Sequence, residues 1–190
     1  FLLLIRLGEH PAYAYNWEPY TAYGLFAFWD RPTYGILRAT GGLITDSSFS
    51  PLVVLPGWLA FALGGVGLLQ LRLATALIAA GAVPLLWWTG RHFVGPGAAT
   101  LAAVLLALSP VYLLYGRTGT LVGLSLIPAL ASVEALRRLL HEPSDRRWLL
   151  ALQVALAFGV YSYAPIRFLW LVALAFLALD VARRPEHWPT

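Results

Sequence analysis

The sequence predicts an all-α fold, a polytopic transmembrane helix bundle with an external loop that carries interfacial helices. Of the 190 residues, 59% are hydrophobic and only 12% are charged, whereas about 25% of a soluble domain is charged. Three segments, 73–90, 98–116 and 148–166, contain no charged residue. Each is close to the roughly 20 apolar residues that a helix needs to cross a bilayer core. So little polar surface cannot cover a water-soluble globule, and lipid must therefore solvate much of the chain.

The chain is expected to be the N-terminal part of one transmembrane domain that covers residues 1–190. Residues 1–7 are predicted to be the end of a first span, because they are mainly apolar and the sequence has no initiating methionine. There is also no cysteine, which excludes disulfides and thiolate metal sites.

Residues 8–71 are predicted to form an external loop with interfacial helices. Residues 8–46 combine carboxylates with many tyrosines and tryptophans, which prefer the level of the lipid headgroups. A helix over about 19–29 is expected to lie along the membrane surface. Two interpretations stay open for this part of the loop, an aromatic anchor or a surface cleft with carboxylates at the lipid–water boundary.

The uncharged stretch 47–71 is long enough to span the membrane, and its placement decides the side of the loop before it. If the stretch spans, that loop is cytoplasmic, and if it is interfacial or re-entrant, the loop is external. Pro51, Pro56-Gly57 and Gly64-Gly65 interrupt the run and weaken a straight helix. The sequence therefore favours an interfacial helix.

About five spans are predicted within residues 72–182, and arginines separate them. The expected spans are 72–90, 97–116, 119–136, 148–164 and 166–182. Alternate loops hold seven arginines on one side and three on the other, and the positive-inside rule makes the richer side cytoplasmic. The seven are Arg91, Arg137, Arg138, Arg146, Arg147, Arg183 and Arg184. The net charge of +4 thus reports orientation in a plasma membrane, not binding to nucleic acid.

The three arginines of the other side are Arg72, Arg117 and Arg167, and Glu18 in the loop is expected to share that external face. Each arginine lies at the end of an apolar span. Such side chains are often anchors that extend to the headgroups. Alternatively, a cluster of arginines fits a lipid phosphate or pyrophosphate, which the planar guanidinium binds through paired donors.

Tyrosines accompany two of these arginines. Tyr112 and Tyr115 precede Arg117 after Pro110, where a kink is expected, and Tyr161 and Tyr163 precede Arg167 around Pro165. These rings suit either an interfacial belt or a platform for a sugar or lipid. The motifs of soluble nucleotide-binding enzymes, serine hydrolases and zinc proteases are absent, and the four scattered histidines predict no metal site.

The order of these segments resembles the dolichyl-phosphate-mannose protein mannosyltransferase (family 39-like) group of GT-C membrane glycosyltransferases. The similarity runs from Glu18 to Arg167 and rests on order and spacing, because no single motif is specific. The segments that carry it are an acidic motif in the external loop, PLxxxxxxLAFALGG, LRLATALIAAGAVPLLWWTGRHF, AATLAAVLLALSPVYLLYGRTG and GVYSYAPIRFLWL.

The resemblance implies a GT-C-like bundle that transfers a sugar from a polyprenyl-phosphate donor to a protein or glycolipid hydroxyl on the external face. It implies Glu18 as the general base and Arg72, Arg117 and Arg167 as ligands of the donor phosphate. It names no certain cofactor and leaves a divalent cation possible.

Three positions depart from the family's pattern. Trp17-Glu18 replaces an acidic pair, Gly116-Arg117 replaces Ser-Arg, and Ser50 precedes Pro51-Leu52 where the family usually has a charged residue. Two alternatives therefore remain beside the transferase, a transporter or flippase of a lipid-linked phosphate or sugar and a diverged, non-catalytic GT-C-like subunit.

Overall fold

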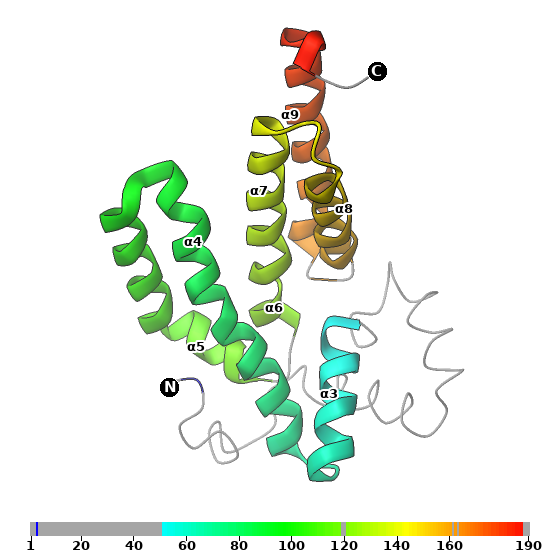
Figure 1. Ribbon diagram of the computed structural model, residues 1–190. Coiled ribbons are helices and arrows are strands. Elements are labelled where there is room, and N and C mark those ends of the chain that lie inside the picture. Colours follow the sequence, from blue (N-terminus) through cyan, green and yellow to red (C-terminus); the bar gives the residue numbers. More distant parts are fainter. Residues whose placement is uncertain (1–2, 4–50, 119–120, 161, 163, 188–190) are drawn as a thin grey trace, which may run out of the picture.

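The computed structural model describes residues 3, 51–118, 121–160, 162 and 164–187. Within these ranges every regular element is a helix and no strand occurs, which confirms the all-α class for this part of the chain. The helices form two groups, α3 to α6 around the long helix α4, and α7 to α9 beside them (Figure 1).

Helix α3 (Pro51–Gly64) packs against the first half of α4 (Leu68–Leu108) in the opposite direction (Figure 1). The reversal occurs at Gly65, whose φ of 79° lies in the left-handed region that favours glycine. Val53, Val54 and Phe61 of α3 are buried in one apolar cluster with Leu71 of α4. The stretch predicted to be an interfacial helix is thus a 14-residue helix packed along α4, and its position in the membrane stays a prediction.

Helix α4 is a hairpin of two arms, 68–94 and 96–108. Gly95 separates them with a non-helical backbone of φ 80° and ψ 163°, and Pro96 then begins the second arm, a position that proline favours. The arms approach closely, since a Cβ on Gly90 would lie 3.5 Å from the Cβ of Ala99. The turn of this hairpin lies at the upper left of Figure 1.

Helix α5 (Pro110–Arg117) follows α4 after a break at Ser109, whose ψ of 119° is extended. The Ser109 hydroxyl accepts a hydrogen bond from the amide of Tyr112 at 3.3 Å, so it caps the new helix. The kink expected at Pro110 is confirmed as a complete break. The short α6 (Leu121–Leu124) leads into α7 (Leu126–His141), and the segments before and after this turn differ in direction by 114°.

Helices α7, α8 (Arg146–Val160) and α9 (Leu169–Arg183) run alternately up and down (Figure 1). The 3₁₀ helix η3 (Ala164–Phe168) joins α8 to α9, and η4 (Pro185–His187) follows α9. The core of this group is small, and large apolar side chains cover its outside, as expected for a surface in contact with lipid. The core residues are Ala135, Leu139, Leu152, Leu156 and Ala173.

The predicted number of spans is not established by the described helices. Only α4 is long and apolar enough to cross a membrane, and the bent pair 110–117 and 122–141 would make a second candidate if it acts as one span. The predicted span 97–116 is divided at Ser109. Helices α8 and α9 have 15 residues each, fewer than the roughly 20 that a full crossing needs.

The directions of the helices agree with the predicted separation of the arginines. The α4 turn, the α7–α8 connection and the end of α9 lie toward the upper side of Figure 1, and they carry the seven arginines assigned to one face. The start of α4, the end of α5 and η3 lie toward the lower side of Figure 1. These segments carry Arg72, Arg117 and Arg167.

Candidate functional site

Arg72 lies in the first turns of α4 and is completely buried, with 0% of its surface exposed. An arginine that merely anchors a helix extends its guanidinium to water or headgroups. Full burial instead requires polar partners within the protein. For Arg72, the anchor interpretation is therefore wrong and the interpretation as part of an internal site remains.

A hydrogen bond between helices joins the Arg72 end of α4 to the Arg117 end of α5. The hydroxyl of Thr75, 1% exposed, donates toward the Arg72 carbonyl at 3.0 Å and toward the carbonyl of Thr118 at 3.3 Å. Thr118 is itself fully buried. The helix ends that carry the two predicted arginines therefore meet, although the arginines are 45 positions apart in the sequence.

Small residues make this close approach possible. A Cβ on Gly116 would lie 2.9 Å from Leu3 and 3.2 Å from the Cβ of Ala79. A Cβ on Gly123 would lie 2.5 Å from the carbonyl oxygen of Tyr115. The departure of Gly116 from the serine of the family's pattern thus has a packing reason, because α5 lies almost directly on α4 at this position.

Arg167 lies in η3 and is half-buried. Its Nε donates a hydrogen bond of 3.1 Å to the carbonyl of Val160 at the end of α8. This contact closes the turn between α8 and α9 and holds the stem of the side chain. Arg167 thus has a structural role, and its role as a phosphate ligand stays a prediction.

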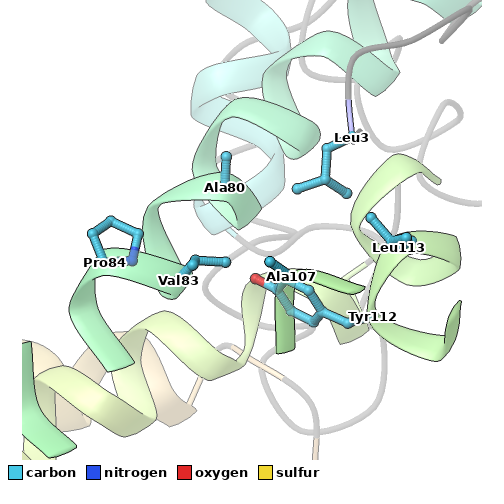
Figure 2. Close-up of a pocket in the computed structure, with 7 residues that line it drawn as sticks. All are labelled: Leu3, Ala80, Val83, Pro84, Ala107, Tyr112 and Leu113. Carbon is cyan, nitrogen blue, oxygen red and sulfur yellow. The ribbon is translucent and has the colours of Figure 1, made fainter. Parts of the chain in front are cut away.

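An apolar pocket of about 310 Å³ lies between the two arms of α4 and α5 (Figure 2). The Tyr112 ring lines the pocket, and its hydroxyl donates a 2.5 Å hydrogen bond to the carbonyl of Ala79. Ala80 is eight positions after Arg72 on the same arm, or about 12 Å along the helix axis. The lining residues are Leu3, Ala80, Val83, Pro84, Ala107, Tyr112 and Leu113.

Three predicted site residues, Glu18, Tyr161 and Tyr163, lie outside the described residues, as does the helix predicted over about 19–29. Tyr115 is described and half-buried. Its carbonyl accepts a hydrogen bond of 3.2 Å from the Thr118 hydroxyl. The predicted tyrosine platform therefore stays a prediction.

The sequence interpretation missed a cluster at the arginine-rich end. The Glu134 carboxylate, largely buried, accepts hydrogen bonds from Arg137 at 2.8 and 2.9 Å and from Arg138 at 2.7 Å. The Arg138 guanidinium also lies 4.4 Å from the centre of the Trp148 ring on α8. The spacing of Glu134 three and four positions before two arginines is the signal that could have revealed this cluster.

The described residues contain no group of three or more histidine, cysteine, aspartate or glutamate side chains that could hold a metal ion. The polar region around Thr75 and Thr118 is built instead from guanidinium groups, hydroxyls and main-chain carbonyls. The carbonyls accept hydrogen bonds from the hydroxyls, and the guanidinium donors fit an anionic ligand better than a cation.

One protein family matches most of the length of the chain. The family model for dolichyl-phosphate-mannose-protein mannosyltransferase matches residues 49–188, which include all three arginines but not Glu18. No curated protein and no solved structure matches the chain. The family points to a membrane-embedded glycosyltransferase of the GT-C type that uses lipid-linked sugar donors. The match covers well over half of the chain, which therefore belongs to the dolichyl-phosphate-mannose-protein mannosyltransferase family.

Proposed function

We propose that this chain transfers a sugar from a polyprenyl-phosphate donor to a hydroxyl of a protein or glycolipid acceptor on the external face of a plasma membrane. The observation that carries the proposal is the hydrogen bond of Thr75 to Thr118. It joins the helix ends that bear Arg72 and Arg117, and a glycosyltransferase with a phosphate-linked donor needs positive charge where its leaving group departs.

In this proposal, Arg72, Arg117 and Arg167 bind the donor phosphate. Arg72 is fully buried, and a guanidinium in a low-dielectric site interacts with an anion more strongly than one in water. Arg117 is half-exposed, so it is the more accessible of the pair for an entering ligand. Arg167 is the third ligand, held by its bond to Val160.

The apolar pocket beside Tyr112 supports a lipid-linked donor. Its walls are mainly apolar, and it begins about 12 Å along α4 from Arg72. A lipid phosphate bound at the arginines could therefore place the first part of its chain in this pocket. A water-soluble sugar nucleotide has no comparable apolar part.

Glu18 is the proposed general base. It takes the proton of the acceptor hydroxyl while that oxygen attacks the anomeric carbon, and the bond from this carbon to the phosphate oxygen breaks. Polyprenyl phosphate leaves with the electron pair of the broken bond. A carboxylate with an ordinary pKa near 4.3 is a weak base for a hydroxyl, but it suffices when the proton moves late, after the attacking oxygen has become acidic.

The test uses the purified chain and polyprenyl-phosphate mannose as the donor probe. Arg117→Gln is expected to raise the KM for the donor about tenfold, because one charge-assisted contact to phosphate is lost. Glu18→Gln is expected to lower turnover by about 10²- to 10⁴-fold with donor binding retained. Arg146→Gln, an exposed arginine of the opposite end, is the control that should change neither value.

Each variant tests its own role. An unchanged donor KM in Arg117→Gln would remove this arginine from the phosphate site, and turnover like that of the unaltered chain in Glu18→Gln would remove Glu18 as base. Donor binding by the unaltered chain without release of polyprenyl phosphate would favour the transporter or flippase alternative.

The proposed face is tested separately, since the chain has no cysteine. Single cysteines replace Tyr20 and Glu142, and a thiol reagent that cannot cross the membrane is added to intact cells. Labelling at position 20 with protection at position 142 is expected. The reverse pattern would invert the proposed orientation.

A further inference from the structure

The turn of the α4 hairpin is a fixed structure at the arginine-rich end of the molecule. We call residues 87–97 the hairpin tip. Trp87 donates a hydrogen bond of 3.1 Å from its indole nitrogen to the Thr100 hydroxyl on the second arm. That hydroxyl in turn donates to the carbonyl of Pro96 at 2.8 Å. These bonds hold the indole of Trp87 in one position across the turn.

Arg91 lies over the two indoles of the tip. The central carbon of its guanidinium is 3.9 Å from the centre of the Trp88 ring and 4.9 Å from that of Trp87. Its Nε is buried without a hydrogen-bond partner, and in the described part of the chain no carboxylate forms an ion pair with it. Stacking fixes the plane of the guanidinium and leaves its terminal nitrogens at the edge as donors.

The surroundings of Arg91 carry net positive charge. Desolvation and then the positive charge of Arg137 lower the pKa of His92, with smaller contributions from Arg91 and Arg138 and an opposing one from Glu134. The tip thus lies within electrostatic range of the α7 cluster. Glu134 is already bound to both α7 arginines, so the charge of Arg91 is not neutralised by it.

Exposed apolar side chains surround this cation. Phe93 is 59% exposed, Val94 61% and Trp88 41%. In a membrane protein, large apolar residues beside a stacked arginine indicate the boundary between headgroups and acyl chains. A ligand for the tip should therefore have an anionic group joined to hydrocarbon.

We propose that the hairpin tip binds the phosphate of an anionic phospholipid through the guanidinium of Arg91, with the acyl chains against Phe93 and Val94. A phospholipid without an ammonium group is preferred, because a choline or ethanolamine headgroup would meet the positive charge of Arg91 and of the α7 arginines. This site is at the opposite end from the proposed donor site and does not depend on it.

The test measures binding of phosphatidylglycerol and phosphatidylcholine with identical acyl chains to the delipidated full chain in detergent, by native mass spectrometry. Phosphatidylglycerol is expected to occupy the unaltered chain at about tenfold lower concentration than phosphatidylcholine, because both lipids offer a phosphate but only the choline ammonium meets the positive charge of Arg91. Arg91→Gln should remove most of this preference. Arg183→Gln, an exposed arginine at the same end, should retain it.

Trp88→Leu keeps the charge of Arg91 but removes the ring beneath it, and an intermediate preference is expected. Arg91→Lys replaces Arg91→Gln as the test if the latter does not fold. A lysine keeps the charge but lacks the planar guanidinium, so this variant should weaken the preference for phosphatidylglycerol.

Three outcomes would overturn the proposal. The first is an unchanged preference in the folded Arg91 variant. The second is an equal loss of preference in Arg183→Gln, which would indicate diffuse charge. The third is displacement of the lipid by inorganic phosphate at similar concentrations, which would indicate a site for soluble phosphate.

Discussion

The region from α3 to α6 and the bundle from α7 to α9 hold their helices together by different means. In the first region, small residues let the helices approach closely, as is typical of helix contacts in membranes. Ala76, Ala79 and Ala82 of α4 have no exposed surface, and Gly116 faces Ala79 across the contact. Polar groups lie inside this region, including the fully buried Arg72 and Thr118.

The bundle from α7 to α9 has most of its described charges near one end instead, apart from Arg167 in η3 at the other end. Glu134 bridges two arginines there, and Arg138 stacks on Trp148 of the next helix. Its lipid-facing helix α9 buries only Ala173 among its own residues. Trp170 of α9 donates to the carbonyl of Leu156 on α8 at 3.2 Å.

The two regions bury different charged groups. Polar residues inside a membrane-embedded protein are costly and are usually kept for function. The first region buries Arg72, whereas the bundle buries Glu134, a carboxylate that is already bound to Arg137 and Arg138. Three substitutions test this difference, each measured as thermal and denaturant unfolding of the purified chain in detergent micelles.

Gly123→Ala should have the largest effect. The new Cβ would lie 2.5 Å from the Tyr115 carbonyl oxygen and 2.8 Å from the Gly116 amide nitrogen, and a main chain cannot move aside without disturbing α5. We expect a loss of about 3 kcal/mol, the upper end of the usual cost of overpacking. Gly97→Ala is the control, because nothing lies within 4 Å of its Cβ position. Equal stability of the two variants would show that α5 and α6 are not in close contact.

Glu134→Ala should be the next largest. It leaves Arg137 and Arg138 without their shared carboxylate, and hydrogen bonds to charged groups contribute about 2 kcal/mol. Glu142→Ala, an exposed carboxylate just after α7, should change stability by less than about 0.5 kcal/mol. If both variants lose the same amount, the cluster does not stabilise the bundle.

Tyr112→Phe should have the smallest effect, a loss of about 1 kcal/mol for one hydrogen bond to the carbonyl of Ala79. The ring remains and still lines the apolar pocket. Val111→Ala, at a neighbouring position that is 65% exposed, is the matched control. Unchanged stability of Tyr112→Phe would mean that the hydroxyl finds an equivalent partner.

Much of the fold followed from local patterns. Pro110 predicted a kink and the structure has a helix break there, and the positions of the arginines predicted where the chain reverses. The helix lengths did not follow, because hydropathy cannot tell whether an apolar run continues as one helix. Ser109 lies within an apolar run, so hydropathy alone includes it in a span. Its hydroxyl nevertheless caps a new helix.

The membership of the candidate site stays a prediction, and its arrangement could not be read from the sequence. Residue type and spacing selected Arg72 and Arg117, but an arginine at the end of an apolar run is equally suited to anchor a helix. Only the tertiary structure shows that Arg72 is internal. Gly116 illustrates the same limit. From the sequence, its replacement of the family's serine suggests a lost functional group, whereas in the structure Ala79 lies opposite it and explains the small residue.

The sequence by itself indicated that this is a membrane protein, and it also indicated the helical class, the family and the division of the arginines between two ends. These properties depend on composition and order, which need no knowledge of contacts. The tertiary structure decided that α4 folds back at Gly95 and that Thr75 meets Thr118. It also decided that Arg91 stacks on Trp87 and Trp88. Contacts between residues 43 positions apart depend on how helices pack, and packing is set by the shapes of side chains on several elements at once.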